Sequence, residues 1–528
     1  MTQAGQWGYV TATAGATVTA TLVPATASGV RLGDMVRIAT GISLCFGLVG
    51  RLWWEGADPE RPEVGRRLAE VVLLGETLDL DRPQDFSFQR GVSVSPSLGS
   101  PVHGATSRDL ALIYAKPSAP SVAVGSLHQD PGIEARVLVD ELLGKHFAIL
   151  GTTGSGKSCA VAVVLGAVLA RCRHGHIVLL DPHDEYAAAF GDMALPVPPD
   201  DLHLPYWLLD FEEMTHVLCS SGQPYREVEA NILKEAVLAA KHEFIATSGG
   251  QDYNLTIDTP APFRLLRVVE ILKTGMGRLD KPESSIPYLR LLARIDSLRK
   301  DRRFGFMFGG LGVEDCMAEV MARLLRLPPG GKPLTVISLA GVPSEIVDVV
   351  VSVLCRLVFD FALWTRRGQG APVLLVCEEA HRYVPRDRTL GFEPTRKAVA
   401  RIAKEGRKYG VSLGLVTQRP SEISESILSQ MNTLFSMRMS NEADQRFVTM
   451  AMPENAAGLL SVLPSLRARE AVVVGEGVSV PMRFAFATLA DGARPKSDTA
   501  KFSTAWGQEA AGDDFVPETI NRWRRQIR

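Results

Sequence analysis

Eight consecutive residues, Gly151 to Ser158, have the types and spacing of a phosphate-binding loop, Gly-Thr-Thr-Gly-Ser-Gly-Lys-Ser. Glycines let successive backbone N–H groups turn inward around a phosphate without a clash of Cβ atoms. We expect Lys157 to reach the β- and γ-phosphates of ATP, and the Ser158 hydroxyl to bind Mg²⁺. The residues expected to contact the nucleotide are Gly151, Thr152, Thr153, Gly154, Ser155, Gly156, Lys157, Ser158 and Cys159.

Two adjacent glutamates, Glu378 and Glu379, end the apolar run VLLVC at residues 373–377. Acids directly after a buried strand are costly unless the strand end opens onto a cleft. A phosphate-loop protein needs carboxylates at such a strand end, to hold the Mg²⁺ shell and to orient the attacking water. We therefore assign Glu378 to the metal shell and Glu379 to the polarisation of water.

Apolar strands that alternate with helices must position these residues, and this pattern begins at about Leu127. It predicts an α/β fold with a mainly parallel sheet that helices cover on both faces. The helix expected after Lys157 and the strand before Gly151 give the phosphate loop its proper setting. The predicted strands are 146–150, 176–180, 334–340, 373–377, 411–417, 433–439 and 471–475.

Further polar groups stand at the ends of these strands. The strand at 411–417 should lie beside the one that carries the glutamates, which places Thr417 and Gln418 where a γ-phosphate sensor would sit. They could equally be ordinary polar groups at a strand end. Asp181 and Glu185 end the second strand and could help with metal or inter-subunit contacts, or could simply be surface acids.

Composition shifts divide the chain of 528 residues into regions. Residues 1–125 are rich in Val, Thr, Ala and Gly, and their short alternating runs predict a small antiparallel barrel or sandwich, with residues 93–104 as a loop. Residues 126–495 form the predicted ATPase core. A segment at about 200–327 has helical periodicity and is expected to be a helical insertion. Residues 496–528 form a tail with a short basic helix.

Overall composition limits the possible partners and compartments. The formal charge of −2 argues against a basic surface over the whole protein, so nucleic acid would bind through a local patch such as a channel lining. The seven cysteines are scattered and include no C-x-x-C pair, which favours buried thiols in a reducing compartment. No signal peptide or membrane span is evident, so we expect a cytoplasmic location.

The motif Glu-Glu-Ala-His at residues 378–381 is close to the Asp-Glu-Ala-His box of certain helicases. Those helicases, however, have two tandem motor domains. Only about 150 residues follow Glu379 here, and no Gln-x-x-Gly-Arg run is present. A single motor domain must take its completing arginine from elsewhere, usually from a neighbouring subunit of a ring. Arg407 is the preferred candidate, and Arg401 and Arg419 compete with it.

Several blocks together resemble the HerA family of hexameric ATPases, which is related to the FtsK DNA pumps. The similarity covers roughly residues 127–484. The blocks are VDELLGKHFAILGTTGSGKS, LLDPHDEY, LLVCEEAHRYVP, AKEGRKYGVSLGLVTQRPSEI, ILSQMNTLFSMRM and LPSLRAREAVVVGEGVSVPMRF.

The resemblance implies a RecA-like motor domain behind a small barrel, and a six-membered ring that moves double-stranded DNA through its pore. It implies a partner on the barrel face, such as a NurA-like nuclease or another effector, in DNA end processing or anti-phage defence. It also implies that the C-terminal tail braces a neighbouring subunit. Two residues depart from the family pattern: Glu378 replaces the usual aspartate, and Arg469 replaces a usual glycine before Glu470.

Two other functions stay open on the sequence. One is a coupling ATPase of conjugation or secretion, although no membrane anchor is evident. The other is a scaffold ring that uses ATP only to assemble and to activate an effector. For DNA contact the sequence offers one basic cluster, for which a solvated helix end is the better interpretation. That cluster consists of Arg299, Lys300, Arg302 and Arg303, and the tail adds Arg522, Arg524 and Arg525, which could pack on a neighbouring subunit.

Overall fold

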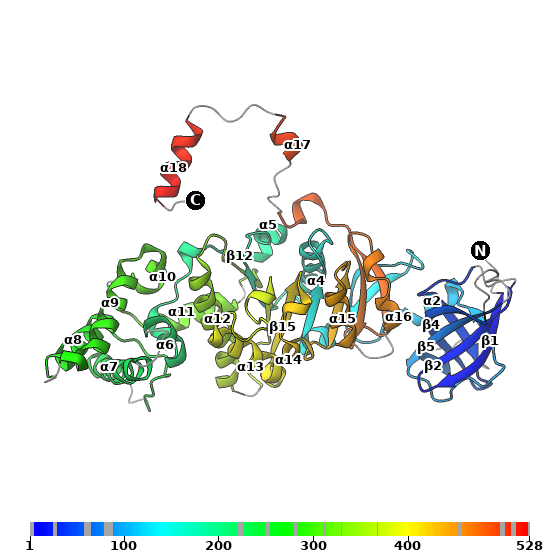
Figure 1. Cartoon of the computed structure of the whole chain (residues 1–528), viewed down its shortest axis with the longest axis horizontal. Coiled ribbons are helices and arrows are strands. Elements are labelled where there is room, and N and C mark those ends of the chain that lie inside the picture. Colours follow the sequence, from blue (N-terminus) through cyan, green and yellow to red (C-terminus); the bar gives the residue numbers. More distant parts are fainter. Residues whose placement is uncertain are drawn as a thin grey trace.

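Three regions follow one another along the molecule: a barrel at one end, a large sheet in the middle and a bundle of helices at the other end (Figure 1). They are seen in a computed structural model of the chain. The structure describes residues 5–24, 29–56, 65–78, 88–219, 225–248, 254–278, 282–309, 313–328, 330–366, 368–451, 457–496, 502–507 and 514–525.

The N-terminal region is a closed antiparallel barrel, as the alternating runs predicted. Its strands follow the order β2-β1-β7-β3-β4-β5, and β2 also pairs with β5, which closes the ring. The strands are β1 (Gln6–Ala14), β2 (Thr17–Leu22), β3 (Met35–Ala39), β4 (Ser43–Glu55), β5 (Arg66–Leu78), β6 (Phe88–Arg90) beside β5, and β7 (Pro101–Gly104).

One strand of the barrel lies where the sequence predicted a loop. β7 occupies the end of that stretch and pairs with both β1 and β3, so the barrel could not close without it. The four residues that begin with Pro101 are too few to show a recognisable alternation of apolar and polar side chains. Strand pairing on both sides supplies the order that the local pattern lacks.

The central sheet has eleven strands within the described residues, in the order β12-β13-β11-β14-β15-β10-β16-β17-β18-β8-β9. The first seven are parallel and the rest pair antiparallel. The strands are β8 (Ser121–Leu127), β9 (Glu134–Leu138), β10 (Phe147–Leu150), β11 (His176–Asp181), β12 (Ala194–Val197), β13 (Leu334–Ser338), β14 (Val373–Cys377), β15 (Val411–Thr417), β16 (Thr433–Met437), β17 (Glu470–Gly475) and β18 (Met482–Phe486).

All seven strands predicted for this sheet are present, and β15 lies beside β14 as expected. The structure adds four strands at the two edges of the sheet, β12, β18, β8 and β9. The predicted boundary between residues 125 and 126 falls inside β8, which belongs to the central sheet because it pairs with β18. The partner strand lies more than 350 residues further along the chain, so no local pattern could assign β8 correctly.

Helices cover both faces of the sheet, because alternate residues of its buried strands point to opposite sides. α4 (Lys157–Arg171) packs with Phe147 and Ile149 on one face, and α12 (Ser344–Trp364) shares the core of Ala148 and Leu150 on the other. α13 (Glu393–Tyr409) packs against α12 and leads directly into β15.

The helical insertion lies between β12 and β13, beyond one edge of the sheet. Its helices include α6 (Phe211–Leu218), α7 (Arg226–Ser248), α8 (Leu265–Met276), α9 (Ile286–Lys300), α10 (Gly305–Phe308) and α11 (Met317–Leu325). A nearly buried ion pair fastens it to the core, with Arg356 Nη2 of α12 2.8 Å from Glu213 Oε2 of α6. In the predicted basic cluster, Lys300 pairs with Asp296 and Arg303 with Asp301, so part of its positive charge is neutralised.

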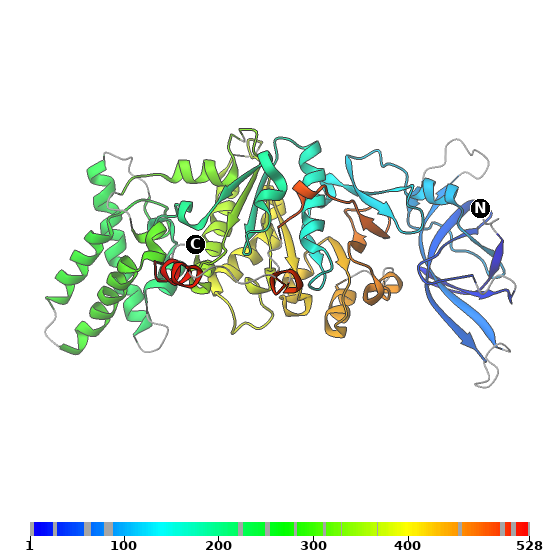
Figure 2. The same cartoon turned by 90° about the horizontal axis from the view of Figure 1, so that it is seen from above.

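The C-terminal arm stands clear of the body of the molecule. It contains α17 (Phe502–Ala505) and α18 (Phe515–Arg525), and the side view shows these helices separated from the remaining ribbon (Figure 1), whereas the view from above draws them in front of it (Figure 2). Trp506 and Trp523 are 82% and 75% exposed. Within the described part of the chain, no helix combines the length and the apolar character that a bilayer crossing requires.

Candidate nucleotide-binding and hydrolysis site

The phosphate loop spans the turn between β10 and α4, at the carboxyl end of the parallel strands. Gly154 and Gly156 adopt φ angles of 75° and 98°, a region that favours glycine, and Gly156 caps the start of α4. A Cβ atom on Gly151 would lie 2.8 Å from Met437 Cβ, so the neighbouring strand leaves room only for glycine. The loop therefore lies at the positive end of a helix, where free backbone N–H groups can bind an anion.

Lys157 is buried at the base of this loop. Its Nζ donates to the backbone oxygen of Thr152 at 3.4 Å. Burial lowers the pKa of Lys157, an effect that the nearby carboxylates of Glu378 and Glu379 oppose. A buried ammonium group beside a glycine loop is suited to binding a phosphate. The negative charge of the phosphate would compensate for the hydration that the ammonium group loses on burial.

The other residues of the loop are fixed by neighbouring strands. The backbone N and the Oγ1 of Thr152 both donate to the carbonyl oxygen of Arg438, each at 3.0 Å, which ties the loop to the end of β16. Ser158 Oγ donates to Glu185 Oε2 at 2.8 Å. Burial raises the pKa of the Cys159 thiol in the first turn of α4.

The paired glutamates meet the phosphate loop from β14, two strands away across β15. Both are buried, with exposed fractions of 5% for Glu378 and 8% for Glu379. The Oε2 atom of each has no hydrogen-bond partner among the described residues. Burial, reinforced by repulsion from Glu379, raises the pKa of Glu378 to about 8. Orphaned buried carboxylate oxygens facing a phosphate loop fit a divalent cation, so Ser158 and Glu378, with Glu185 nearby, could hold Mg²⁺.

Glu379 is held in a strained and closely surrounded position. Its φ of 53° lies in the left-handed region, which a non-glycine residue occupies at a cost of roughly 1–3 kcal/mol. Gln418 Nε2 donates to Glu379 Oε1 at 3.0 Å, and His381 Nδ1 lies 3.3 Å from Glu379 Oε2. His183 Nε2 lies 3.8 Å from Oε1. The side chain is therefore oriented from three sides.

Gln418 links the two halves of the site. Its Oε1 accepts from the Thr153 hydroxyl of the phosphate loop while its amide donates to Glu379. His381 Nδ1 also lies 3.0 Å from Thr417 Oγ1, at the end of β15. Gln418 is thus bonded at once to the phosphate loop and to Glu379. Its role as a γ-phosphate sensor stays a prediction.

Two acidic residues, Asp181 at the end of β11 and Glu185 in the turn after it, have different surroundings. Asp181 accepts hydrogen bonds from the backbone N of His183 and of Tyr186, at 3.2 and 2.9 Å, and so shapes the turn after β11. Glu185, further along this turn, reaches the Ser158 hydroxyl. Both acids were predicted from the sequence, whereas His183 and His381 were not. The only sequence signal for His381 is its place inside the Glu-Glu-Ala-His run.

The three candidate arginines lie in different settings. Arg401 pairs with Asp360 at 3.4 Å and its guanidinium stacks over the Phe359 ring, 4.3 Å from the centroid. Arg419 pairs with Glu422 at 2.9 Å. Arg407 is exposed on the last turn of α13 and makes no ion pair to a described residue.

The distance of Arg407 from its own site follows from the strand direction. α13 ends where β15 begins, whereas Thr417 and Gln418 end β15 beside the phosphate loop. Seven residues of strand span about 20 Å. Arg407 therefore lies near the amino-terminal ends of the strands, whereas its own nucleotide site lies at their carboxyl ends. It is available to another molecule rather than to its own site.

A glycine loop between a strand and a helix, with paired acids at the end of a nearby strand of the same sheet, defines the class of P-loop ATPases. The family model "Helicase HerA, central domain" matches residues 122–358. The chain is 26% identical over 418 residues to the DNA double-strand break repair helicase HerA of Pyrococcus furiosus, with 72% of each chain covered. It is 27% identical over 398 residues to the Saccharolobus solfataricus protein of that name, covering 74% of this chain and 72% of that one.

The chain is therefore similar to HerA-type helicases over its central region and most of its length, and it is an ATP-hydrolysing enzyme. Solved structures show looser likenesses. VirB4 of Thermoanaerobacter pseudethanolicus has a TM-score of 0.46 at 15% identity, covering 71% of this chain and 98% of that one. The bacterial conjugative coupling protein TrwB has a TM-score of 0.47 at 13% identity, covering 75% and 95%.

Proposed function

We propose that this ATPase forms a homohexameric ring that moves double-stranded DNA through its pore. The observation that carries the proposal is the placement of Arg407. It is exposed and without an ion pair to a described residue, at the sheet edge opposite its own phosphate loop. A subunit that presents its arginine to the next subunit makes hydrolysis depend on assembly, as a rotary or sequential motor requires.

The residues of the site have separate tasks in this proposal. Lys157 and the backbone of the phosphate loop bind the β- and γ-phosphates, and Glu379 orients the attacking water and takes up its proton. Gln418 keeps Glu379 at the phosphate loop through its two hydrogen bonds. Mg²⁺, held by Ser158 and Glu378, would neutralise charge on the phosphate oxygens.

DNA enters the proposal through the relatives, which are named as DNA double-strand break repair helicases. A pore that grips phosphates independently of sequence would give binding that weakens steeply with salt. The barrel, at one end of the molecule, is the proposed docking face for a nuclease such as NurA or for another effector, in DNA end processing or anti-phage defence (Figure 1). A cytoplasmic location remains a prediction.

ATP turnover with and without double-stranded DNA tests this function. Lys157→Ala should abolish turnover, because the phosphates lose their buried cation. Glu379→Gln should lower kcat at least 100-fold while ATP binding persists, since an amide cannot take the proton of the water. Glu425→Gln, an exposed glutamate on α14 (Glu425–Leu428), is the matched control and should leave the rate unchanged.

Double-stranded DNA should raise the wild-type rate, and the mass of the assembly should equal six chains. A wild-type rate for Glu379→Gln would refute the role of that residue. Turnover that ignores DNA, in a ring that assembles only with ATP, would favour a scaffold that activates an effector instead.

A further inference from the structure

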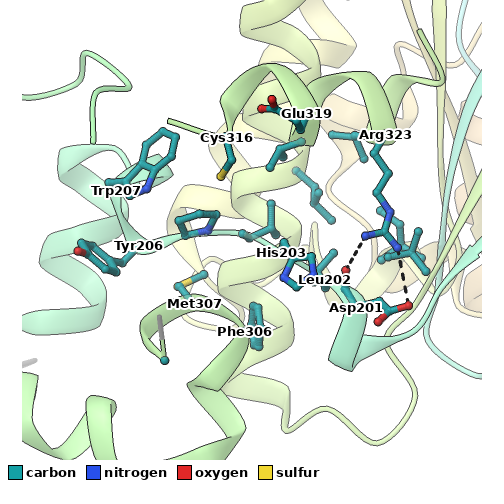
Figure 3. Close-up of a pocket in the computed structure, with 18 of the residues that line it drawn as sticks. Asp201, Leu202, His203, Tyr206, Trp207, Phe306, Met307, Cys316, Glu319 and Arg323 are labelled. Carbon is teal, nitrogen blue, oxygen red and sulfur yellow. Dashed lines mark hydrogen bonds and ion pairs between the residues drawn. The ribbon is translucent and has the colours of Figure 1, made fainter. Parts of the chain in front are cut away.

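The helical insertion and the edge of the central sheet enclose an apolar cavity of about 780 Å³ (Figure 3). Trp207 and Met307 are buried in its wall, and its floor comes from β13 and α12. β13 is separated from β10, the strand before the phosphate loop, by β11, β14 and β15. The cavity therefore lies away from the nucleotide site, and the side chains that can influence hydrolysis lie at the carboxyl ends of these strands.

At that end of the sheet, one oxygen of the buried Glu379 carboxylate faces His381. Glu379 Oε1 accepts a hydrogen bond from Gln418, whereas Oε2 has no hydrogen-bond partner among the described residues. His381 Nδ1 lies 3.3 Å from this Oε2 atom. A buried carboxylate oxygen without a partner is costly, and a small rotation of the imidazole would give it one.

Strand β15 holds the imidazole of His381 in place. Nδ1 lies 3.0 Å from the hydroxyl oxygen of Thr417, the buried last residue of β15. Thr417 Oγ1 also accepts a hydrogen bond from the backbone N of Arg419 at 3.0 Å. The two atoms that Nδ1 approaches are both oxygens, and one belongs to the Glu379 carboxylate, so Nδ1 is the ring nitrogen that carries the hydrogen.

Both oxygens of Glu379 are thus connected to the same strand end. Oε1 is bonded to Gln418, which also accepts from Thr153 of the phosphate loop, and Oε2 is reached from Thr417 through His381. The φ of 53° at Glu379 is a strained conformation, which persists only where surrounding contacts determine it. A shift at the end of β15 would therefore turn the whole carboxylate rather than one oxygen.

We propose that His381 is a positioning residue for ATP hydrolysis, whose Nδ1–H is shared between Thr417 and Glu379 Oε2. The hydrogen bond to Oε2 fixes the direction in which Glu379 points at the attacking water, and the bond to Thr417 lets the end of β15 control it. Because His381 acts through Glu379, it should set the rate of the chemical step and leave ATP binding unchanged. The inference rests on the role of Glu379 in the proposed function.

Substitutions at His381 that differ in where they place an N–H group test this role. His381→Asn keeps a donor close to the position of Nδ1, His381→Gln keeps one close to Nε2, and His381→Ala keeps neither. At saturating ATP, His381→Gln and His381→Ala should lower kcat at least tenfold, whereas His381→Asn should stay within threefold of wild type. The affinity for a non-hydrolysable ATP analogue should change less than twofold in all three.

A second measurement shows whether His381 acts through Glu379. In a Glu379→Gln background, adding His381→Ala should lower the remaining rate less than twofold, because the carboxylate that His381 positions is already gone. His174→Ala is the matched control and should leave kcat unchanged. This exposed histidine lies in the turn after α4, one helix length away from the phosphate loop.

Equal losses for His381→Asn and His381→Ala would overturn the inference, because the position of the N–H group would then not matter. A tenfold loss that persists in the Glu379→Gln background would also overturn it, and so would a wild-type kcat for His381→Ala; the proposed function would stand in each case. If His381→Ala failed to bind the analogue, the comparison of His381→Asn with His381→Gln would decide. A wild-type rate for Glu379→Gln would instead refute the role of Glu379 in the proposed function.

Discussion

Arg469 occupies a backbone position that normally requires glycine. Its φ is 67°, and its backbone N donates to the Ser155 oxygen of the phosphate loop at 2.9 Å. The resemblance to the HerA family led us to expect a departure from a glycine turn at this place. The structure shows that the turn is kept and that Arg469 adopts the left-handed conformation itself, at a cost of roughly 1–2 kcal/mol.

Arg469→Gly should therefore stabilise the ATPase region by about 1 kcal/mol, because glycine adopts this conformation without strain. The expected result is a higher thermal unfolding midpoint, measured by calorimetry. Arg467→Gly is the control, at a residue outside the left-handed region, where the added freedom of the unfolded chain should destabilise by about 0.5–1 kcal/mol. A lower midpoint for Arg469→Gly would show that its side chain outweighs the strain.

At the residue level the sequence predicted the phosphate loop and both glutamates, because consecutive residues carry those motifs. It could not predict that Gln418 bridges Thr153 and Glu379, since that contact depends on the order of three strands. His183 was missed for the same reason. It reaches Glu379 only because β11 and β14 are neighbours.

At the level of elements, the helical insertion contains a buried lysine that affects its stability. Lys241 of α7 is 1% exposed, and its Nζ donates to the backbone oxygens of Ile257 and Thr259 at 2.7 and 2.6 Å. Burial lowers the pKa of Lys241 to about 8. The unfolded chain, with a pKa near 10.4, therefore binds this proton more tightly than the folded chain does.

Stability should rise with pH through this window, because the unfolded state holds more protons. Between pH 8 and 9.5, wild type should gain about 1.5 kcal/mol relative to Lys241→Met. The difference between the two denaturation curves at each pH measures this gain. Lys234→Met, at an exposed lysine of the same helix, is the control and should show no such pH-dependent difference. A constant difference for Lys241→Met would mean that Lys241 titrates normally.

The long, regular elements were predictable and the edge elements were not. Strands such as β14 and β15 can be recognised from the sequence, because both of their faces are buried and their residues form continuous apolar runs. β12 has four residues, including a proline, and is ordered by its pairing with β13. The insertion was expected from its helical periodicity, but the cavity beneath it depends on how separate segments pack.

At the scale of the whole molecule, Arg407 is predicted to act on the site of a neighbouring subunit. Rings of Arg407→Ala chains should lose most of their ATP turnover, and so should rings of Glu379→Gln chains. Mixing the two should restore part of the activity, because some interfaces then combine an intact arginine with an intact glutamate. Lys408→Ala is the matched control on the same helix end and should remain active. Mixed rings without recovery would contradict the action in trans.

The pairing of β8 with β18 has a practical consequence for anyone who separates the barrel from the ATPase region. The two ends of the ATPase region are joined in one sheet, with Phe484 opposite Leu127 and Ala485 opposite Ser126. A fragment that begins at residue 126 would lack most of β8. The edge of β18 would then be unpaired, and unpaired strand edges promote aggregation. An ATPase region without the barrel should therefore begin before Ser121, within the chain that links the two regions.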